Sequence, residues 1–157
     1  MYNKLYLAII TILIFSDLVW SNDDIGYKFY EKGQYDKALK IWNEEIVQGN
    51  KEALYNIGLL YYFGKGVDKN LSLAFNYCKK AALKGLARAQ NNLAFMYMKG
   101  MGTKKSYISA YAWSVIAIKN GYNAQGIKDD AKINMTPAML IDAKKLIVKI
   151  NKEMEYE

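Results

Sequence analysis

Few side chains in this sequence could carry out covalent or metal-assisted chemistry. The chain of 157 residues contains no histidine and one cysteine, Cys78. Histidine is the commonest general base and metal ligand, and a catalytic thiolate needs a histidine or another group that lowers its pKa. Free cysteines are among the most buried residue types. We therefore expect Cys78 to be a buried thiol in a helix contact, and we expect no catalytic residue, metal site or cofactor.

Adjacent carboxylates occur twice, at Glu44 and Glu45 and at Asp129 and Asp130. Neighbouring residues of a helix point about 100° apart, so the two members of a pair do not face one another or a common substrate. Neither pair is therefore arranged to act as a general acid and a general base. We interpret all four side chains as solvated charges.

Basic side chains are more informative about partners. Lys and Arg number 22 against 15 acidic residues, and between Lys65 and Lys119 only Asp68 is acidic. Five of these lysines fall in two turns that we expect at the same end of the molecule: Lys65, Lys69, Lys99, Lys104 and Lys105. An excess of positive charge attracts acidic partners, but the alternative is that it serves only to keep the protein soluble. We expect an acidic protein or an anionic envelope surface, and not nucleic acid, because no recognised binding motif is present.

An internal repeat with an offset of 36 residues marks the elements that must position these side chains. Residues 51–85 align with residues 87–121 at the following pairs: Ala53 with Ala89, Asn56 with Asn92, Tyr61 with Tyr97, Gly64 with Gly100, Gly66 with Gly102, Ala74 with Ala110, Tyr77 with Trp113, Ala81 with Ala117, and Gly85 with Gly121. A fixed period with small and aromatic residues in phase is typical of stacked helix pairs. The glycines at 64 and 66 follow a helical pattern and lack a nucleotide-binding fingerprint, so we expect a tight turn with positive φ.

The pattern A-x-x-x-I-G-x-x-Y-x-x-G-x-G-V-x-x-x-x-x-x-A-x-x-Y-x-x-x-A-A-x-x-G runs from Ala53 to Gly85. It resembles the Sel1-like repeat, an α/α relative of the tetratricopeptide repeat with a longer glycine-containing turn. The third unit departs from this pattern mildly, at Ala94, at residues 101–103 and at Ile118. The resemblance implies an all-α fold, an α/α solenoid of about three such helix pairs with a C-terminal capping helix pair.

The repeat domain is expected to span residues 22–157, with units at about 22–50, 51–86 and 87–122 and a cap at 123–157. The first unit shows a tetratricopeptide-like spacing from Gly26 to Trp42. In the cap, residues 124–134 read as a short helix, and Thr136 and Pro137 are typical of the start of another. The Met-Thr-Pro segment with the Ala- and Lys-rich helix after it is similar to the closing segment of many bacterial Sel1-like proteins.

The N-terminus reads as a secretory signal peptide at residues 1–21. Lys4 precedes an apolar run from Leu5 to Phe15, and Ser21 is a small residue suited to a cleavage site. An uncleaved anchor is the alternative, but a spanning helix needs roughly 20 apolar residues and Asp17 interrupts this run. We expect export to the periplasm or outside the cell.

The resemblance also implies function, because this family mostly mediates protein contacts. The expected partner is a protein or peptide, bound on the concave face formed by the first helix of each unit. Candidate residues of that face are Tyr27, Tyr30, Glu52, Tyr55, Leu59, Tyr62, Phe63, Arg88, Asn91, Phe95, Met98 and Lys99. The alternative is a cell-wall-active or β-lactam-hydrolysing enzyme, an activity linked to relatives with regular cysteine pairs, which this chain lacks. Three units are near the minimum for a solenoid, and the oligomeric state stays open.

Overall fold

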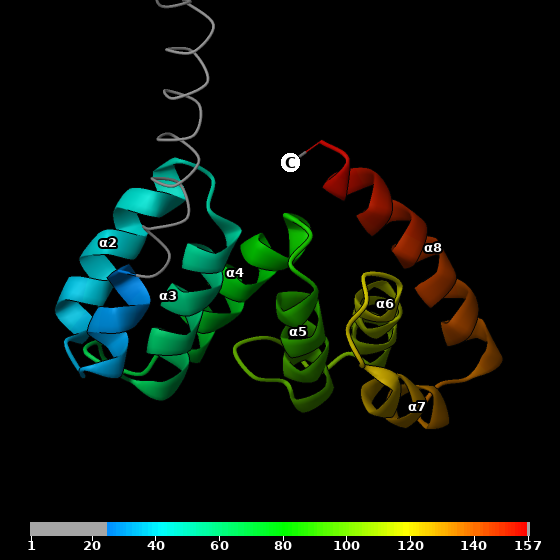
Figure 1. Ribbon diagram of the computed structural model, residues 1–157. Coiled ribbons are helices and arrows are strands. Elements are labelled where there is room, and N and C mark those ends of the chain that lie inside the picture. Colours follow the sequence, from blue (N-terminus) through cyan, green and yellow to red (C-terminus); the bar gives the residue numbers. More distant parts are fainter. Residues whose placement is uncertain (1–24, 157) are drawn as a thin grey trace, which may run out of the picture.

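The computed structural model describes residues 25–156, which form helices packed in consecutive pairs (Figure 1). The predicted signal peptide lies outside these residues. Residues 25–31 are helical and pair with the helix after them. The remaining helices are α2 (Tyr35–Val47), α3 (Lys51–Phe63), α4 (Leu71–Leu83), α5 (Ala87–Lys99), α6 (Tyr107–Lys119), α7 (Gln125–Ile133) and α8 (Pro137–Met154). The prediction of an all-α fold of stacked helix pairs is confirmed. None of the helices within residues 25–156 is long and apolar enough to cross a bilayer.

The helix boundaries follow the local signals in the sequence. Asn70 and Ser106 hold equivalent places in the two repeats, and each side chain accepts a hydrogen bond from a backbone N–H in the first turn of the next helix. Thr136 caps α8 in the same way, with Pro137 at the first helical position as predicted. Asn70, Ser106 and Thr136 therefore fix where three helices start.

Small residues let the helices cross closely. Alanines at the small-residue positions of the units are at most 2% exposed: Ala38, Ala53, Ala74, Ala81, Ala89, Ala94, Ala110 and Ala117. Larger apolar side chains fill the space beside these crossings, and Ile57 and Leu93 do so at equivalent, fully buried positions. From α2 to α7 each helix packs against the next along the chain, whereas α8 packs mainly on α6 rather than on α7.

Each long turn packs on the unit before it. In the turn between α3 and α4, Gly66 has φ +69°, and a Cβ added there would overlap the Cβ of Tyr35 at the start of α2. In the turn between α5 and α6, Gly102 also has φ +69°, and its added Cβ would overlap the carbonyl group of Leu71 at the start of α4. The second glycine of the turn is therefore where one unit touches the previous one, and only glycine fits this position without strain.

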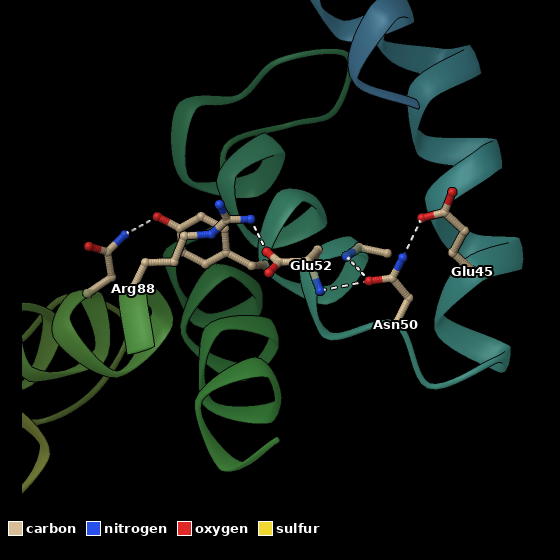
Figure 2. A network of polar contacts seen from close by, with 7 residues as sticks. Glu45, Asn50, Glu52 and Arg88 are labelled. Atoms are coloured by element: carbon tan, nitrogen blue, oxygen red, sulfur yellow. Dashed lines mark hydrogen bonds and ion pairs between the residues drawn. The ribbon is translucent and has the colours of Figure 1, made fainter. Parts of the chain in front are cut away.

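The expectation for Glu45 is wrong. Glu44, Asp129 and Asp130 are exposed, as expected, but Glu45 is 3% exposed. Its carboxylate accepts a hydrogen bond from Nδ2 of Asn50, the residue that caps α3 (Figure 2). Glu45 lies on the side of α2 that packs against α3, close to the positive end of the α3 dipole, which favours a negative charge.

Candidate functional site

A cavity of about 200 Å³ opens where α3, α4 and α5 meet. Its lining is mostly apolar and comes from all three helices: Tyr55, Gly58, Leu59, Tyr62 and Phe63 of α3, Ala74 and Cys78 of α4, and Asn92, Phe95 and Met96 of α5. Gly58 and Ala74 leave room because they carry little or no side chain. A Cβ added to Gly58 would lie 3.4 Å from the carbonyl oxygen of Ala74, so the two backbones already touch there.

A second cavity of about 150 Å³ lies between α3 and the N-terminal unit. Its lining residues are Tyr27, Tyr30, Trp42, Asn56 and Leu59. Leu59 lines both cavities, so they lie next to each other along α3. We call this surface, made of the residues that line the two cavities, the α3 groove.

One end of the groove is closed by polar contacts near the start of α3 and α5. Arg88 forms an ion pair with Glu52, and its guanidinium lies 5.0 Å from the centre of the Tyr55 ring (Figure 2). Nδ2 of Asn92 donates a hydrogen bond of 2.7 Å to the Tyr55 hydroxyl. Burial raises the pKa of Tyr55 to about 12 and outweighs the hydrogen bond from Asn92, which lowers it. The phenol therefore stays neutral at physiological pH. These contacts tie α5 to α3 across this end.

The other end of the groove carries lysines on aromatic rings. Nζ of Lys65 donates a hydrogen bond of 2.8 Å to the Tyr30 hydroxyl and lies 5.8 Å from the centre of the Phe63 ring. The hydrogen bond to Tyr30 is the main reason that the pKa of Lys65 is raised, so this side chain stays protonated. Nζ of Lys99 lies 5.9 Å from the centre of the Phe95 ring. The rings beneath these lysines remain accessible, since Phe63 is 57% and Phe95 37% exposed.

The prediction that Cys78 is a buried thiol in a helix contact is confirmed. It is 5% exposed, and its Sγ–H donates a hydrogen bond of 3.3 Å to the Ala89 carbonyl oxygen. Burial raises the pKa of the thiol to about 12, so it is protonated at neutral pH and is a poor nucleophile. No cluster of three or more His, Cys, Asp or Glu side chains with the spacing of a metal site occurs in residues 25–156.

Most of the candidate residues lie in or beside the groove. Seven of them line it: Tyr27, Tyr30, Tyr55, Leu59, Tyr62, Phe63 and Phe95. Glu52 and Arg88 flank its closed end, and Lys99 flanks the other. Asn91 is half-buried and lines neither cavity. Met98 does not reach the groove, because it is 8% exposed and packs with Ala110 of α6 and Ala131 of α7.

Sequence reasoning missed the part of the lining that comes from α4 and the inner side of α5. Ala74, Cys78, Asn92 and Met96 all line the cavity, yet each was assigned to the core or left unassigned. The one signal in the sequence is the pairing of Gly58 with Ala74, two small residues at a helix crossing. It predicts a close approach of the backbones, but not that space is left beside them.

The comparisons with known proteins agree with the fold of paired helices. The sequence pattern of the Sel1 repeat matches residues 51–86 and 87–122. Protein sel-1 homolog 2 of Mus musculus is 40% identical over 72 residues, which is 45% of this chain and 10% of that protein. ERAD-associated E3 ubiquitin-protein ligase component HRD3A of Arabidopsis thaliana is 35% identical over 72 residues, 45% of this chain and 11% of that protein. The chain thus spans about a tenth of the length of these relatives.

Two solved structures share the arrangement of helices. One is a protective antigen present in uropathogenic Escherichia coli strains and displays an SLR fold. It matches with a TM-score of 0.78 and 26% identity, over 85% of this chain and 30% of that chain. The other is a Sel1 repeat protein from Oxalobacter formigenes, with a TM-score of 0.59 and 31% identity over 64% of this chain and 43% of that chain. Both likenesses extend beyond the two matched repeats.

Proposed function

Because this chain belongs to the Sel1 repeat family, we propose that it is a scaffold that binds another protein or a peptide through the α3 groove. The observation that carries the proposal is the accessible aromatic surface of the groove. Tyr27, Phe63 and Phe95 are each more than a third exposed, and they gather on one hollowed face. Aromatic residues around a pocket are typical of the anchoring region of protein interfaces.

We propose no catalytic role for the groove. The one nucleophilic side chain that lines it, Cys78, is protonated and hydrogen-bonded to a backbone carbonyl. A nitrocefin assay on the purified protein tests this. We expect no turnover, and turnover that disappears in a Cys78→Ala variant would contradict the scaffold proposal.

We also propose that the scaffold is exported, with cleavage after Ser21, to the periplasm or outside the cell. The support is the signal-like pattern of residues 1–21. Mass spectrometry of the mature protein should find Asn22 as the first residue. An N-terminus that retains residues 1–21 would contradict cleavage.

Selection of random dodecapeptides displayed on phage tests the binding function directly. The purified protein is the bait, and the enriched peptide is then measured against two double variants. Phe63→Ala with Phe95→Ala removes exposed aromatic surface from the groove. Val47→Ala with Val148→Ala removes exposed apolar surface from the end of α2 and from α8, and neither residue lines the groove. All four side chains are at least 37% exposed, so neither variant should disturb the core.

We expect the groove variant to bind the enriched peptide at least about tenfold more weakly, since a few central aromatic residues dominate most interfaces. The control variant should bind as the unchanged protein does. Equal affinity of both variants would place binding elsewhere, and a selection that enriches no peptide would argue against a peptide-binding scaffold.

A further inference from the structure

The size and lining of the larger cavity limit what it can hold. Sites for small molecules and cofactors usually have volumes of about 300–1,000 Å³, whereas this cavity has about 200 Å³. The Tyr55 hydroxyl is already engaged by Asn92, and the Tyr62 hydroxyl faces the Met101 sulfur at 3.7 Å. The cavity therefore offers mainly apolar contact, over a volume suited to one side chain.

The charges around this cavity are unevenly placed. At its closed end the charge of Arg88 is balanced by Glu52. At the other end, Lys65 and Lys99 have no ion-pair partner within residues 25–156. Both lie at the carboxyl-terminal ends of the helices that form the walls, Lys99 as the last residue of α5 and Lys65 two residues after α3 ends.

The two lysines are also held next to the cavity. Lys65 is fixed by its hydrogen bond to Tyr30 and lies over the ring of Phe63, and Lys99 lies over the ring of Phe95. Phe63 and Phe95 themselves line the cavity. An apolar side chain that enters the cavity therefore touches the rings that carry the cations, and the residues next to it in the partner lie within reach of Lys65 and Lys99.

We infer that the α3 groove recognises an acidic peptide segment, of which one large apolar side chain enters the cavity between α3, α4 and α5 while neighbouring carboxylates pair with Lys65 and Lys99. This inference rests on the proposed scaffold function and specifies its partner. The apolar side chain supplies most of the affinity, because its burial removes apolar surface from water. The carboxylates supply selectivity and a dependence on ionic strength.

Three fluorescein-labelled peptides test the inference by fluorescence anisotropy. The parent peptide is Ser-Asp-Glu-Leu-Phe-Asp-Glu-Ser. The neutral peptide replaces its acidic residues by Asn and Gln, and the anchorless peptide replaces Leu-Phe by Ala-Ala. We expect the anchorless peptide to bind about tenfold or more weakly than the parent. The neutral peptide should bind about two- to fivefold more weakly for each lysine contact it loses, with the difference shrinking at 0.5 M salt, where charges are screened.

Protein variants assign these effects to the groove. Lys65→Gln with Lys99→Gln should weaken the parent peptide to the level of the neutral one and leave the neutral peptide unchanged. Lys144→Gln with Lys149→Gln removes the same charge from exposed positions of α8 and should change nothing. Cys78→Leu fills the cavity from its buried side. It should weaken the parent peptide about tenfold, and Phe95→Ala gives an independent, exposed test of the same pocket should Cys78→Leu unfold the protein.

The outcomes separate this inference from the proposed function. If the phage selection yields groove-dependent peptides but the neutral and parent peptides bind equally well, the acidic specificity is wrong and the scaffold function stands. If Cys78→Leu remains folded and both it and Phe95→Ala bind the parent with unchanged affinity, the anchor is wrong. If no peptide from either experiment binds, both proposals fail.

Discussion

The contact between Gly102 and the previous unit gives the sharpest test of the stacking. A Cβ at Gly102 would overlap the Leu71 carbonyl oxygen and lie 2.6 Å from the Leu71 carbonyl carbon. At Gly121 the φ angle is also positive, +87°, but a Cβ would meet no atom within 4 Å. Gly121→Ala is therefore destabilising only through the left-handed backbone conformation, whereas Gly102→Ala is destabilising through the same conformation and through the steric overlap with Leu71. The difference between the two variants isolates the inter-unit contact.

The magnitudes follow from these two costs. A left-handed conformation costs an alanine roughly 1–2 kcal/mol, and forcing an extra methyl into packed surroundings costs about 1–3 kcal/mol more. We expect Gly121→Ala to lower the free energy of unfolding by about 1–2 kcal/mol and Gly102→Ala by about 2–5 kcal/mol. Gly66→Ala should fall between them, because its added Cβ would overlap the Tyr35 Cβ less severely than the Cβ at Gly102 overlaps the Leu71 carbonyl oxygen.

Urea denaturation followed by far-ultraviolet circular dichroism measures these differences. The three variants share the same Gly→Ala substitution, so its effect on the denatured state is matched. They also share a positive φ, so the backbone strain in the folded state is similar. If Gly102→Ala and Gly121→Ala are destabilised equally, the turn does not press on α4. The account of how one unit stacks on the previous one would then be refuted.

Three further predictions concern buried polar groups. The folded protein keeps the Cys78 thiol protonated, with a pKa raised from 9.0 to about 12, while the unfolded thiol ionises near pH 9. The free energy of unfolding should therefore fall as the pH rises above 9, and ionisation of this thiol should account for about 1 kcal/mol of the loss at pH 10. Urea denaturation of a Cys78→Val variant should show a decline with pH that is smaller by this amount. The side chain of Gln90 is fully buried, donates a hydrogen bond to the Ala82 carbonyl and accepts one from Asn120. Gln90→Leu should therefore lower the free energy of unfolding, measured by urea denaturation, by about 1–2 kcal/mol. An unchanged free energy would show that these hydrogen bonds contribute nothing to stability. Asn50→Ala should lower the thermal midpoint more than Asn70→Ala, because Asn50 caps two N–H groups and donates to a buried carboxylate whereas Asn70 accepts one exposed bond. Equal shifts would contradict that reasoning.

The helices were predictable because the sequence marks them locally. Residues 51–121 repeat small and aromatic residues in phase, and Asn70, Ser106 and Thr136 are residues that favour helix starts. The capping signals act within a few residues of the helix start, and the repeat is visible in the sequence itself, so the rest of the fold is not needed to recognise either one. The order of stacking then follows from the short connections between helices.

The errors concern residues whose surroundings are set by a distant element. Glu45 looks like a surface carboxylate by residue type, and only the packing of α2 on α3 makes it buried. Met98 holds the place in its unit that Tyr62 holds in the previous one, which predicts the accessible face. The unit after Met98 is not another repeat, however, and α7 covers it at Ala131.

The cavity was beyond sequence reasoning for a related reason. It is the volume left where three helices meet, so it depends on how far α4 and α5 diverge rather than on any one side chain. The small residues Gly58 and Ala74 are consistent with either a filled crossing or an open one. The aromatic residues of α3 were predicted correctly as neighbours of one another, but not as the wall of a cavity with Cys78 on its inner side.

The most direct test of the central claim is a methyl NMR spectrum of the protein with and without the parent peptide. Leu59, Ala74 and Met96 line the cavity, and their methyl groups should shift on binding. The exposed methyl groups of Val47 and Val148 serve as references away from the groove. We predict shifts confined to the cavity. Shifts at Val47 or Val148 with an unchanged cavity, or a spectrum that the peptide leaves unaltered, would contradict a binding site between α3, α4 and α5.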